Sequence, residues 1–383
     1  MKSVYLDNAA TTAILPEVVD VMTKVLTETY GNPSSTHNYG RNAKAIVEQA
    51  RKTIAKQLNV SSSEIIFTSG GTEADNFILQ SAIKDLGVKT IITTKIEHHA
   101  VLNTVNYLSK NYAIEIVFLD LDENGQINYN QLSETLESKE NVLVSLMHVN
   151  NEIGNILDIK KVADLCQANN ALFHSDTVQS IGHYNLDLEA IKVDFIAVSA
   201  HKFHGPKGVG FAFIRKNSGL HPMIFGGEQE RGQRAGTESI HNIAGLETAF
   251  KIAYQNLEKD REYITNLKVY CLEQLKSAIP SISFNGLCDD LEKSTYTIIN
   301  FRLPELSKNA TMIQFHLDLK GIACSRGSAC QSGSTKNSHV LEAILKNTKP
   351  HEASLRISFS KFNTKEDVDF LVAVLEDIVH SKS

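Results

Sequence analysis

The sequence predicts an α/β fold in which helices cover both faces of a seven-stranded, mostly parallel sheet, followed by a smaller α+β domain. Two observations carry this prediction. Short apolar runs alternate with helical stretches up to about residue 215, which is the pattern of strands joined by helical crossovers. The chain has 383 residues, which is long for one hydrophobic core, so two domains are expected.

Each expected strand of the large sheet is a short apolar run that ends at polar or turn-forming residues. The seven runs are 64–68, 89–93, 114–119, 142–149, 171–175, 193–199 and 209–214. Helices are expected between them at 75–86, 99–109, 130–137 and 159–168, and before them from Pro16 and over 41–58. The last run follows its predecessor too closely for a helical crossover, so it is expected to pair antiparallel.

The second domain is expected to follow one long helical stretch over residues 240–278. Beyond that stretch, strands are expected at 296–301, 322–325 and 355–358, and helices at 310–319, at 338–346 and near the C-terminus. We therefore expect a large domain over residues 15–260 and a small domain over residues 261–383, against which residues 1–14 pack.

Composition excludes several classes of protein. The net charge of -6 comes without any basic block, which argues against a nucleic-acid binder. No apolar run reaches membrane-spanning length, and Asp7 lies where a signal peptide needs its apolar core. The five cysteines are odd in number and scattered, which suits reduced thiols. We expect a cytoplasmic protein that binds neither nucleic acid nor membrane.

Lys202 stands at the end of the run 193–199, in the segment Ser199-Ala200-His201-Lys202. Open α/β sheets bind their ligands at the carboxyl ends of the strands. A partly desolvated lysine there can lose its proton and form a Schiff base with an aldehyde cofactor. A surface lysine or an anion ligand fits the same local pattern, so the rest of the chain has to decide.

Three other strand ends offer matching chemistry. The Gly-Gly-Thr segment at 70–72 precedes a helix, so it is either an anion cup or a tight turn with Thr72 as the N-cap. His98 can stack on a flat ring or shuttle a proton, or it can cap a helix or bind a metal. Asp176 can pair with a protonated ring nitrogen and Gln179 can reach a ring oxygen, although Asp-Thr is also a common N-cap.

A fifth strand end adds two asparagines, at 150 and 151. Each fragment is weak alone, but phosphate, ring-nitrogen, ring-stacking and aldehyde chemistry at five strand ends together favour one site. The phosphate would be a monoester, because neither glycine segment matches Gly-x-Gly-x-x-Gly or a Walker loop.

A zinc hydrolase is the alternative from a different class, because histidines are frequent. They are His98, His99, His148, His174, His201 and His204. The chain lacks His-Glu-x-x-His spacing and a supporting cysteine pair, so we expect no metal site.

Cys330 lies among small residues, in Arg326-Gly327-Ser328-Ala329-Cys330-Gln331-Ser332-Gly333-Ser334. This composition predicts an exposed, flexible loop. A thiol beside Arg326 could ionise easily and react, or it could be a plain loop cysteine with Cys324 as its buried neighbour.

These segments resemble those of the NifS/IscS-type cysteine desulfurases, class V aminotransferase-like enzymes of fold type I that use pyridoxal 5′-phosphate (PLP). The similar motifs occur in the family's order and span nearly the whole chain. They are Tyr5–Thr12, Gly31–Ser35, Ser69–Glu73, Glu97–Val101, His148–Gly154, Asp176–Gln179, Ser199–Lys202, Arg231–Thr237 and Gly327–Cys330.

The resemblance implies three catalytic residues. Lys202 would hold PLP as a Schiff base and move the substrate α-proton, His98 would stack on the cofactor ring, and Cys330 would receive sulfur. Asp176 would keep the pyridine nitrogen protonated, and Gln179 would hydrogen-bond the ring hydroxyl.

It also implies the remaining binding residues. Asn151 would contact cofactor or substrate, and Thr237 would reach the phosphate of a neighbouring subunit, which requires a homodimer. Asn32 and Arg356 would hold the substrate carboxylate. The residues implied for the phosphate within the chain are Gly71, Thr72, Ser199 and His201.

The implied reaction converts L-cysteine to L-alanine and leaves a persulfide on Cys330, which passes sulfur to an acceptor or iron–sulfur scaffold protein for cluster or thio-cofactor synthesis. The large domain would bind PLP and the small domain would carry the Cys330 loop. A selenocysteine lyase or a small-molecule aminotransferase of the same fold remains open at this point.

Overall fold

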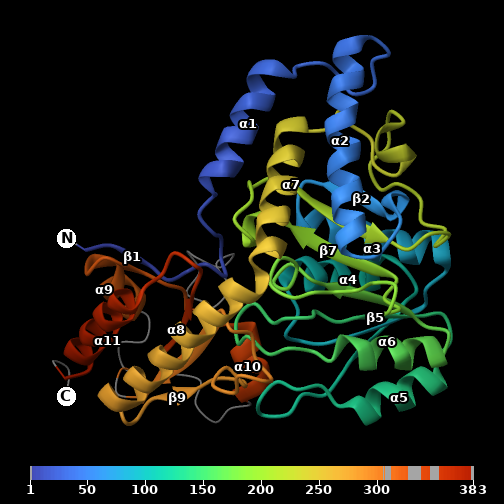
Figure 1. Ribbon diagram of the computed structural model, residues 1–383. Helices are drawn as coiled ribbons and strands as arrows, with labels where there is room; N and C mark the ends of the chain where they lie inside the picture. Colours follow the sequence, from blue (N-terminus) through green and yellow to red (C-terminus); the bar gives the residue numbers. More distant parts are fainter. Residues whose placement is uncertain (1, 305, 307–311, 327–337, 346–352, 381–383) are drawn as a thin grey trace.

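The computed structural model describes residues 2–304, 306, 312–326, 338–345 and 353–380, and its largest element is a seven-stranded sheet (Figure 1). The sheet order is β2-β8-β7-β6-β5-β3-β4. The strands are β2 (Ile65–Thr68), β3 (Thr90–Thr93), β4 (Glu115–Phe118), β5 (Val142–Ser145), β6 (Leu172–Asp176), β7 (Phe195–Ser199) and β8 (Gly210–Ile214). β8 is antiparallel to both neighbours and the other adjacent pairs are parallel, so the predicted sheet is confirmed.

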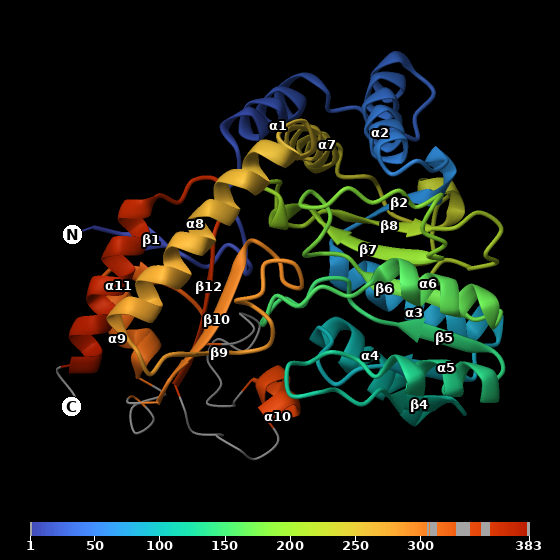
Figure 2. The same cartoon turned by 60° about the horizontal axis from the view of Figure 1, so that its bottom comes forward.

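Helices cover both faces of this sheet (Figure 2). Along β7, Ile196 and Val198 belong to a buried cluster with α2, α6 and α7, whereas Phe195 and Ala197 belong to another with α3 and α4. Successive strand residues point to opposite faces, so a strand buried on both must be apolar throughout. The helices of this part are α1 (Pro16–Glu28), α2 (Asn38–Gln57), α3 (Gly71–Leu86), α4 (His99–Asn111), α5 (Tyr129–Ser138), α6 (Ile159–Ala168) and α7 (Ile240–Gln255).

Two predicted elements were wrong in extent. The strand expected over 142–149 ends at Ser145, and beyond it the Met147 N–H bonds to the Glu97 side chain instead of a neighbouring strand. The helix expected over 240–278 is two helices, α7 and α8 (Leu257–Ala278). Asn256 separates them, because its side-chain amide and its backbone N–H both bond to the Ile252 carbonyl and end α7 there.

The second part of the molecule has its own sheets and its own buried cluster. β10 (Ile298–Leu303) lies between β9 (Ser283–Phe284) and β12 (Ala353–Ser358), and both pairings are antiparallel. β1 (Val4–Tyr5) pairs in parallel with β11 (Ile322–Ala323). Val4 and Leu6 join a cluster formed by residues 264–379, which includes α8, α9 (Ile313–Leu319) and α11 (Lys365–His380). Both termini lie at this end, away from the large sheet (Figures 1 and 2).

α10 (His339–Leu345) packs against the first part of the chain instead. Its Val340, Leu341 and Ile344 form a small cluster with Ile96 and Ile153. α10 therefore lies at the rim of the large sheet, beside the loops that follow β3 and β5. In the described part of the chain, no helix combines the length and apolarity that crossing a membrane would need.

Candidate active site

The predicted strand ends surround one cavity of about 160 Å³. Polar side chains collect there because the carboxyl ends of parallel strands meet at one edge of the sheet. Its lining comes from the ends of β5, β6 and β7, the start of α3, His98, the N-terminal segment and β12. The lining residues are Ala9, Ala10, Gly71, Thr72, Asp75, His98, Met147, Asn151, Asp176, Val178, Gln179, Ser199, His201, Lys202 and Arg356.

Lys202 lies one short 3-10 turn after β7, in Ala200–Lys202. Its Nζ donates to the carbonyl oxygens of Ala9, at 2.5 Å, and Ala10, at 2.9 Å. The N-terminal segment is held there in turn by Gln179, whose Nε2 donates to the same Ala9 oxygen at 2.9 Å. Two neutral carbonyl groups thus hold the lysine amine at the cavity.

The start of α3 borders the cavity, where the sequence allows either an anion cup or a tight turn. The helix N-cap is Gly70, which has no side chain to satisfy the first N–H groups, and Thr72 lies inside the helix. The alternative with Thr72 as N-cap is therefore wrong. A Cβ on Gly71 would lie 2.5 Å from Val178 Cγ2, so only glycine permits this close packing under the cup. Free N–H groups and the helix dipole at this point favour an anion.

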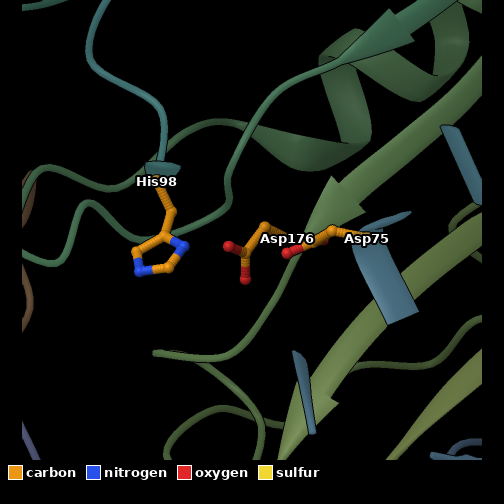
Figure 3. A group of neighbouring side chains, drawn as sticks. All are labelled: Asp75, His98 and Asp176. Carbon is orange, nitrogen blue, oxygen red and sulfur yellow. The ribbon is translucent and has the colours of Figure 1, made fainter. Parts of the chain in front are cut away.

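Two carboxylates and one imidazole lie together in the cavity lining (Figure 3). One ligand atom of each of Asp75, His98 and Asp176 lies within 4.8 Å of the others. Burial raises the pKa of Asp176 to about 6 and raises the pKa of Asp75 well above its usual range. The charge of Asp176 raises the pKa of Asp75 further. The pair therefore favours either a shared proton or a cation placed against it.

His98 is neutral and has a fixed tautomer. Burial, with the charges of Lys202 and His339, lowers its pKa to about 4. Its Nδ1 accepts from the Ala100 N–H at 3.1 Å, so His98 is the N-cap of α4 as well as a cavity residue. The ring proton is then on Nε2, which can donate to a ligand.

Arg356 approaches the cavity from β12 and is almost fully buried, at 1% exposure. Its guanidinium donates to the Asn151 carbonyl and to Asp7, each at 2.8 Å. Its Nε has no hydrogen-bond partner among the described residues. A buried guanidinium with free donors is suited to a carboxylate ligand.

Two of the described site residues are not brought to this cavity, and a third predicted residue is not described. Asn32 is exposed and its side chain accepts from the Ser34 N–H. Thr237 is exposed and does not line the cavity. Cys330 lies outside the described residues, so its role stays a prediction.

Sequence reasoning missed two contributors. Asp75 lies four residues after Gly71, and this spacing places it on the same helix face as the cup, which was a usable signal. The carbonyls of Ala9 and Ala10 carry no side-chain signal, and only the tertiary fold brings them to Lys202.

The arrangement of potential metal ligands gives little support to a zinc site. In the described ranges, Asp75, His98 and Asp176 form the one group of three potential metal ligands, and it contains a single histidine. His148 and His174 are buried, and burial lowers the pKa of each, to about 4 and about 3.

Comparisons with known proteins agree with this geometry. Residues 4–371 match the family Aminotransferase class-V. A cysteine desulfurase IscS from Dictyoglomus turgidum is 40% identical over 99% of this chain and 95% of its own length. A solved NifS-like protein superposes with a TM-score of 0.90 at 35% identity, covering 99% of this chain and 100% of its own. SspA, solved in complex with cysteine, reaches 0.80 at 29% identity, covering 95% and 100%. The chain belongs to the aminotransferase class-V family and, within it, to the cysteine desulfurases.

Proposed function

We propose that this chain holds pyridoxal 5′-phosphate in the cavity at Lys202 and transfers the sulfur of L-cysteine to Cys330. The observation that carries the proposal is that Lys202, Asp176 and the start of α3 border one cavity. An amine, a buried acid and an anion cup are the three groups needed for an aldehyde, a basic ring nitrogen and a phosphate.

The residues present fit this cofactor. The phosphate would lie at Gly71 and Thr72, with Ser199 and His201 beside them, and Lys202 would hold the aldehyde carbon covalently. A ring N–H against Asp176 would supply the positive charge that two close, buried carboxylates lack. When bound, PLP supplies an electron sink for the pair released at the substrate Cα.

Other cavity residues would contact the ring. The neutral His98 would stack on it, Gln179 would hydrogen-bond the ring hydroxyl, and Asn151 would contact cofactor or substrate.

The chain's own groups would bind and orient the substrate. Arg356 would hold the L-cysteine carboxylate without Asn32, which does not line the cavity. Lys202 would remove the α-proton once substrate occupies the cavity. The Cys330 thiolate would then attack the substrate sulfur. An S–S bond forms as the Cβ–S bond breaks, and the electron pair left on Cβ takes a proton. Lys202 would return a proton to Cα, giving L-alanine and a Cys330 persulfide.

The position of Ser325, shortly before Cys330, supports the proposal that the Cys330 thiol can reach the cavity. Ser325 donates to Asp7 at 2.9 Å, and Asp7 contacts Arg356 in the cavity wall. Cys330 follows Ser325 by five residues, a span of at most about 18 Å. This reach is compatible with a thiol that meets substrate in the cavity and then an acceptor protein outside.

The assembly is part of the same proposal. We infer a cytoplasmic homodimer in which Thr237 reaches the partner's phosphate, and a sulfur acceptor or iron–sulfur scaffold protein as partner. Thr237 is exposed, and Phe225 is 84% exposed. Both lie in the segment between β8 and α7, which supports an interface along that segment. The separate buried clusters on either side of residues 250–264 support division into domains 15–260 and 261–383 with 1–14.

The experiment compares the purified wild type with Cys330→Ser. Both are expected to be yellow with bound PLP and to change spectrum on addition of L-cysteine, but only the wild type should release L-alanine repeatedly. Lys202→Ala should lose the covalent cofactor. Full turnover by Cys330→Ser would disprove the sulfur-transfer step.

A further inference from the structure

Asp7 is the acidic partner of the buried arginine in the cavity wall. Asp7 Oδ1 lies 2.8 Å from Arg356 Nη2, and the arginine side chain is 1% exposed. The Asn151 carbonyl holds the other end of the same guanidinium at 2.8 Å. The two contacts fix the plane of the guanidinium, while Nε keeps an unused donor.

Asp7 also binds Ser325, the backbone partner of Arg356. The Ser325 hydroxyl donates to Asp7 Oδ2 at 2.9 Å. Ser325 and Arg356 exchange two backbone hydrogen bonds, at 3.1 and 2.7 Å. Asp7 itself is fixed by a parallel backbone bridge to Ser358, so its carboxylate is attached to the strand that carries the arginine.

From this arrangement we propose that Asp7 is the positioning residue of the carboxylate-binding arginine, and that it sets how tightly the cavity holds a substrate carboxylate. The inference rests on the proposed function, in which Arg356 receives the carboxylate of L-cysteine. Asp7 acts in two opposing ways, and each can be measured separately.

The first action is orientation. A buried arginine whose partner is removed is left as an unpaired charge, which drives the side chain to move or to recruit water. Carboxylate recognition needs two N–H groups aimed in one plane. Loss of the Asp7 hydrogen bond should therefore weaken carboxylate binding.

The second action is electrostatic. Asp7 neutralises part of the arginine's charge and repels a second carboxylate bound to the same guanidinium. A residue that keeps the hydrogen bond but carries no charge should bind the substrate carboxylate more tightly. Asparagine meets this condition, because its amide oxygen can accept from Arg356 while its amide nitrogen donates to Ser325.

The test uses the PLP-loaded enzyme and two matched ligands, L-alanine and L-alaninamide, whose affinities are read from the cofactor spectrum. For Asp7→Ala, L-alanine should bind about tenfold more weakly while L-alaninamide changes little. For Asp7→Asn, L-alanine should bind several-fold more tightly, again without a change for the amide. Ser325→Ala should leave the alanine-to-alaninamide ratio unchanged.

A matched control is Asp260→Ala. Asp260 lines a second cavity that also touches Lys202, and it pairs with Lys361 at 3.4 Å rather than with Arg356. This variant should leave the ligand ratio at the wild-type value.

The cofactor-free chain gives a second readout. Asp7→Ala combined with Arg356→Met should unfold at a higher temperature than Asp7→Ala alone, because the unpaired charge has been removed as well. If Asp7→Ala fails to fold, the ratio of L-alanine to L-alaninamide affinity in Asp7→Asn still tests the inference.

An equal loss of both ligands in the Asp7 variants, or an unchanged ligand ratio, would overturn the inference. Weaker alanine binding by Asp7→Asn would overturn the electrostatic part. A wild type whose cofactor spectrum responds to neither ligand would instead disprove the proposed function, on which the inference depends.

Discussion

Glu97, next to His98, is a buried carboxylic acid that links two strand ends. Its oxygens bond to Thr94 Oγ1 at 2.7 Å and to the Met147 N–H at 2.8 Å. Burial, with a contribution from the charge of Asp176, raises the pKa of Glu97 to about 8. In the unfolded chain the same group titrates at about 4.3.

This difference makes the stability of the fold depend on pH. Because the folded pKa is the higher one, the stabilisation is fully present below about pH 4.3 and is lost as pH rises towards about 8. Glu97→Gln copies the protonated acid and both hydrogen bonds. It should match the wild type at pH 4 and exceed it at pH 9 by roughly 5 kcal/mol, measured by denaturant unfolding of the cofactor-free chain.

Glu97→Ala is the control, since it removes both hydrogen bonds and should destabilise the chain at every pH. If stability depends on pH in the same way for the wild type and Glu97→Gln, folding does not raise the pKa of Glu97 and the account is contradicted.

At the residue scale, the sequence predicts most of the cavity but not its supports. Lys202, Asp176, His98 and Gly71 were predictable because polar or small residues directly follow apolar runs, and parallel strands bring such ends together. The Asp7–Arg356 pair was not, because its members are 349 residues apart and only the tertiary fold joins them.

At the level of the elements, two ion pairs hold the segment that links β8 to α7 against the large sheet and its helices. Arg51 of α2 binds Glu230 with both side chains 2% exposed, and Glu230 also accepts the Phe67 N–H of β2. Arg234 binds Glu73 at the start of α3, at 2.8 Å. Glu230 has a φ of 46°, a left-handed conformation that non-glycine residues adopt only when their surroundings enforce it.

Breaking the Arg51–Glu230 pair should therefore be costly. Glu230→Gln removes the buried counter-charge of Arg51 and leaves it only the partly exposed Glu48, at 3.2 Å. We expect a loss of about 3 kcal/mol in denaturant unfolding. Asp164→Asn is the matched control. It removes an exposed pair with Lys160, at 56% and 61% exposure, and should change stability by less than about 0.5 kcal/mol. Equal effects of the two substitutions would contradict this account.

Element boundaries show where local sequence fails. The run 142–149 is apolar enough for a strand throughout, yet β5 ends at Ser145. The Met147 N–H then bonds to the Glu97 side chain, while the His148 N–H still bonds to the Asp176 carbonyl of β6. The helical pattern over 240–278 continues through Asn256, whose side chain ends α7 locally. Hydrophobic periodicity reports burial, and it is insensitive to such single hydrogen bonds.

We propose that the whole molecule works as a dimer in which Thr237 contacts the phosphate bound by the partner subunit, and substitutions of Thr237 test this contact. Thr237→Ala should leave the dimer intact in sedimentation but release PLP about tenfold faster, because one hydrogen bond to the phosphate is lost. Thr237→Ser keeps the hydroxyl and should retain PLP like the wild type. Unchanged PLP release by Thr237→Ala would remove this residue from the phosphate site.

In the proposed reaction, sulfur leaves L-cysteine and is held on Cys330. The chain offers an internal control, since Cys324 is buried and burial raises the pKa of its thiol to about 12. The direct measurement is peptide mass spectrometry of the PLP-loaded enzyme after brief exposure to L-cysteine. We predict one added sulfur on the Cys330 peptide, retained in Cys324→Ser and absent in Cys330→Ser. A persulfide found on Cys324 or another cysteine, with Cys330 unmodified, would contradict the account.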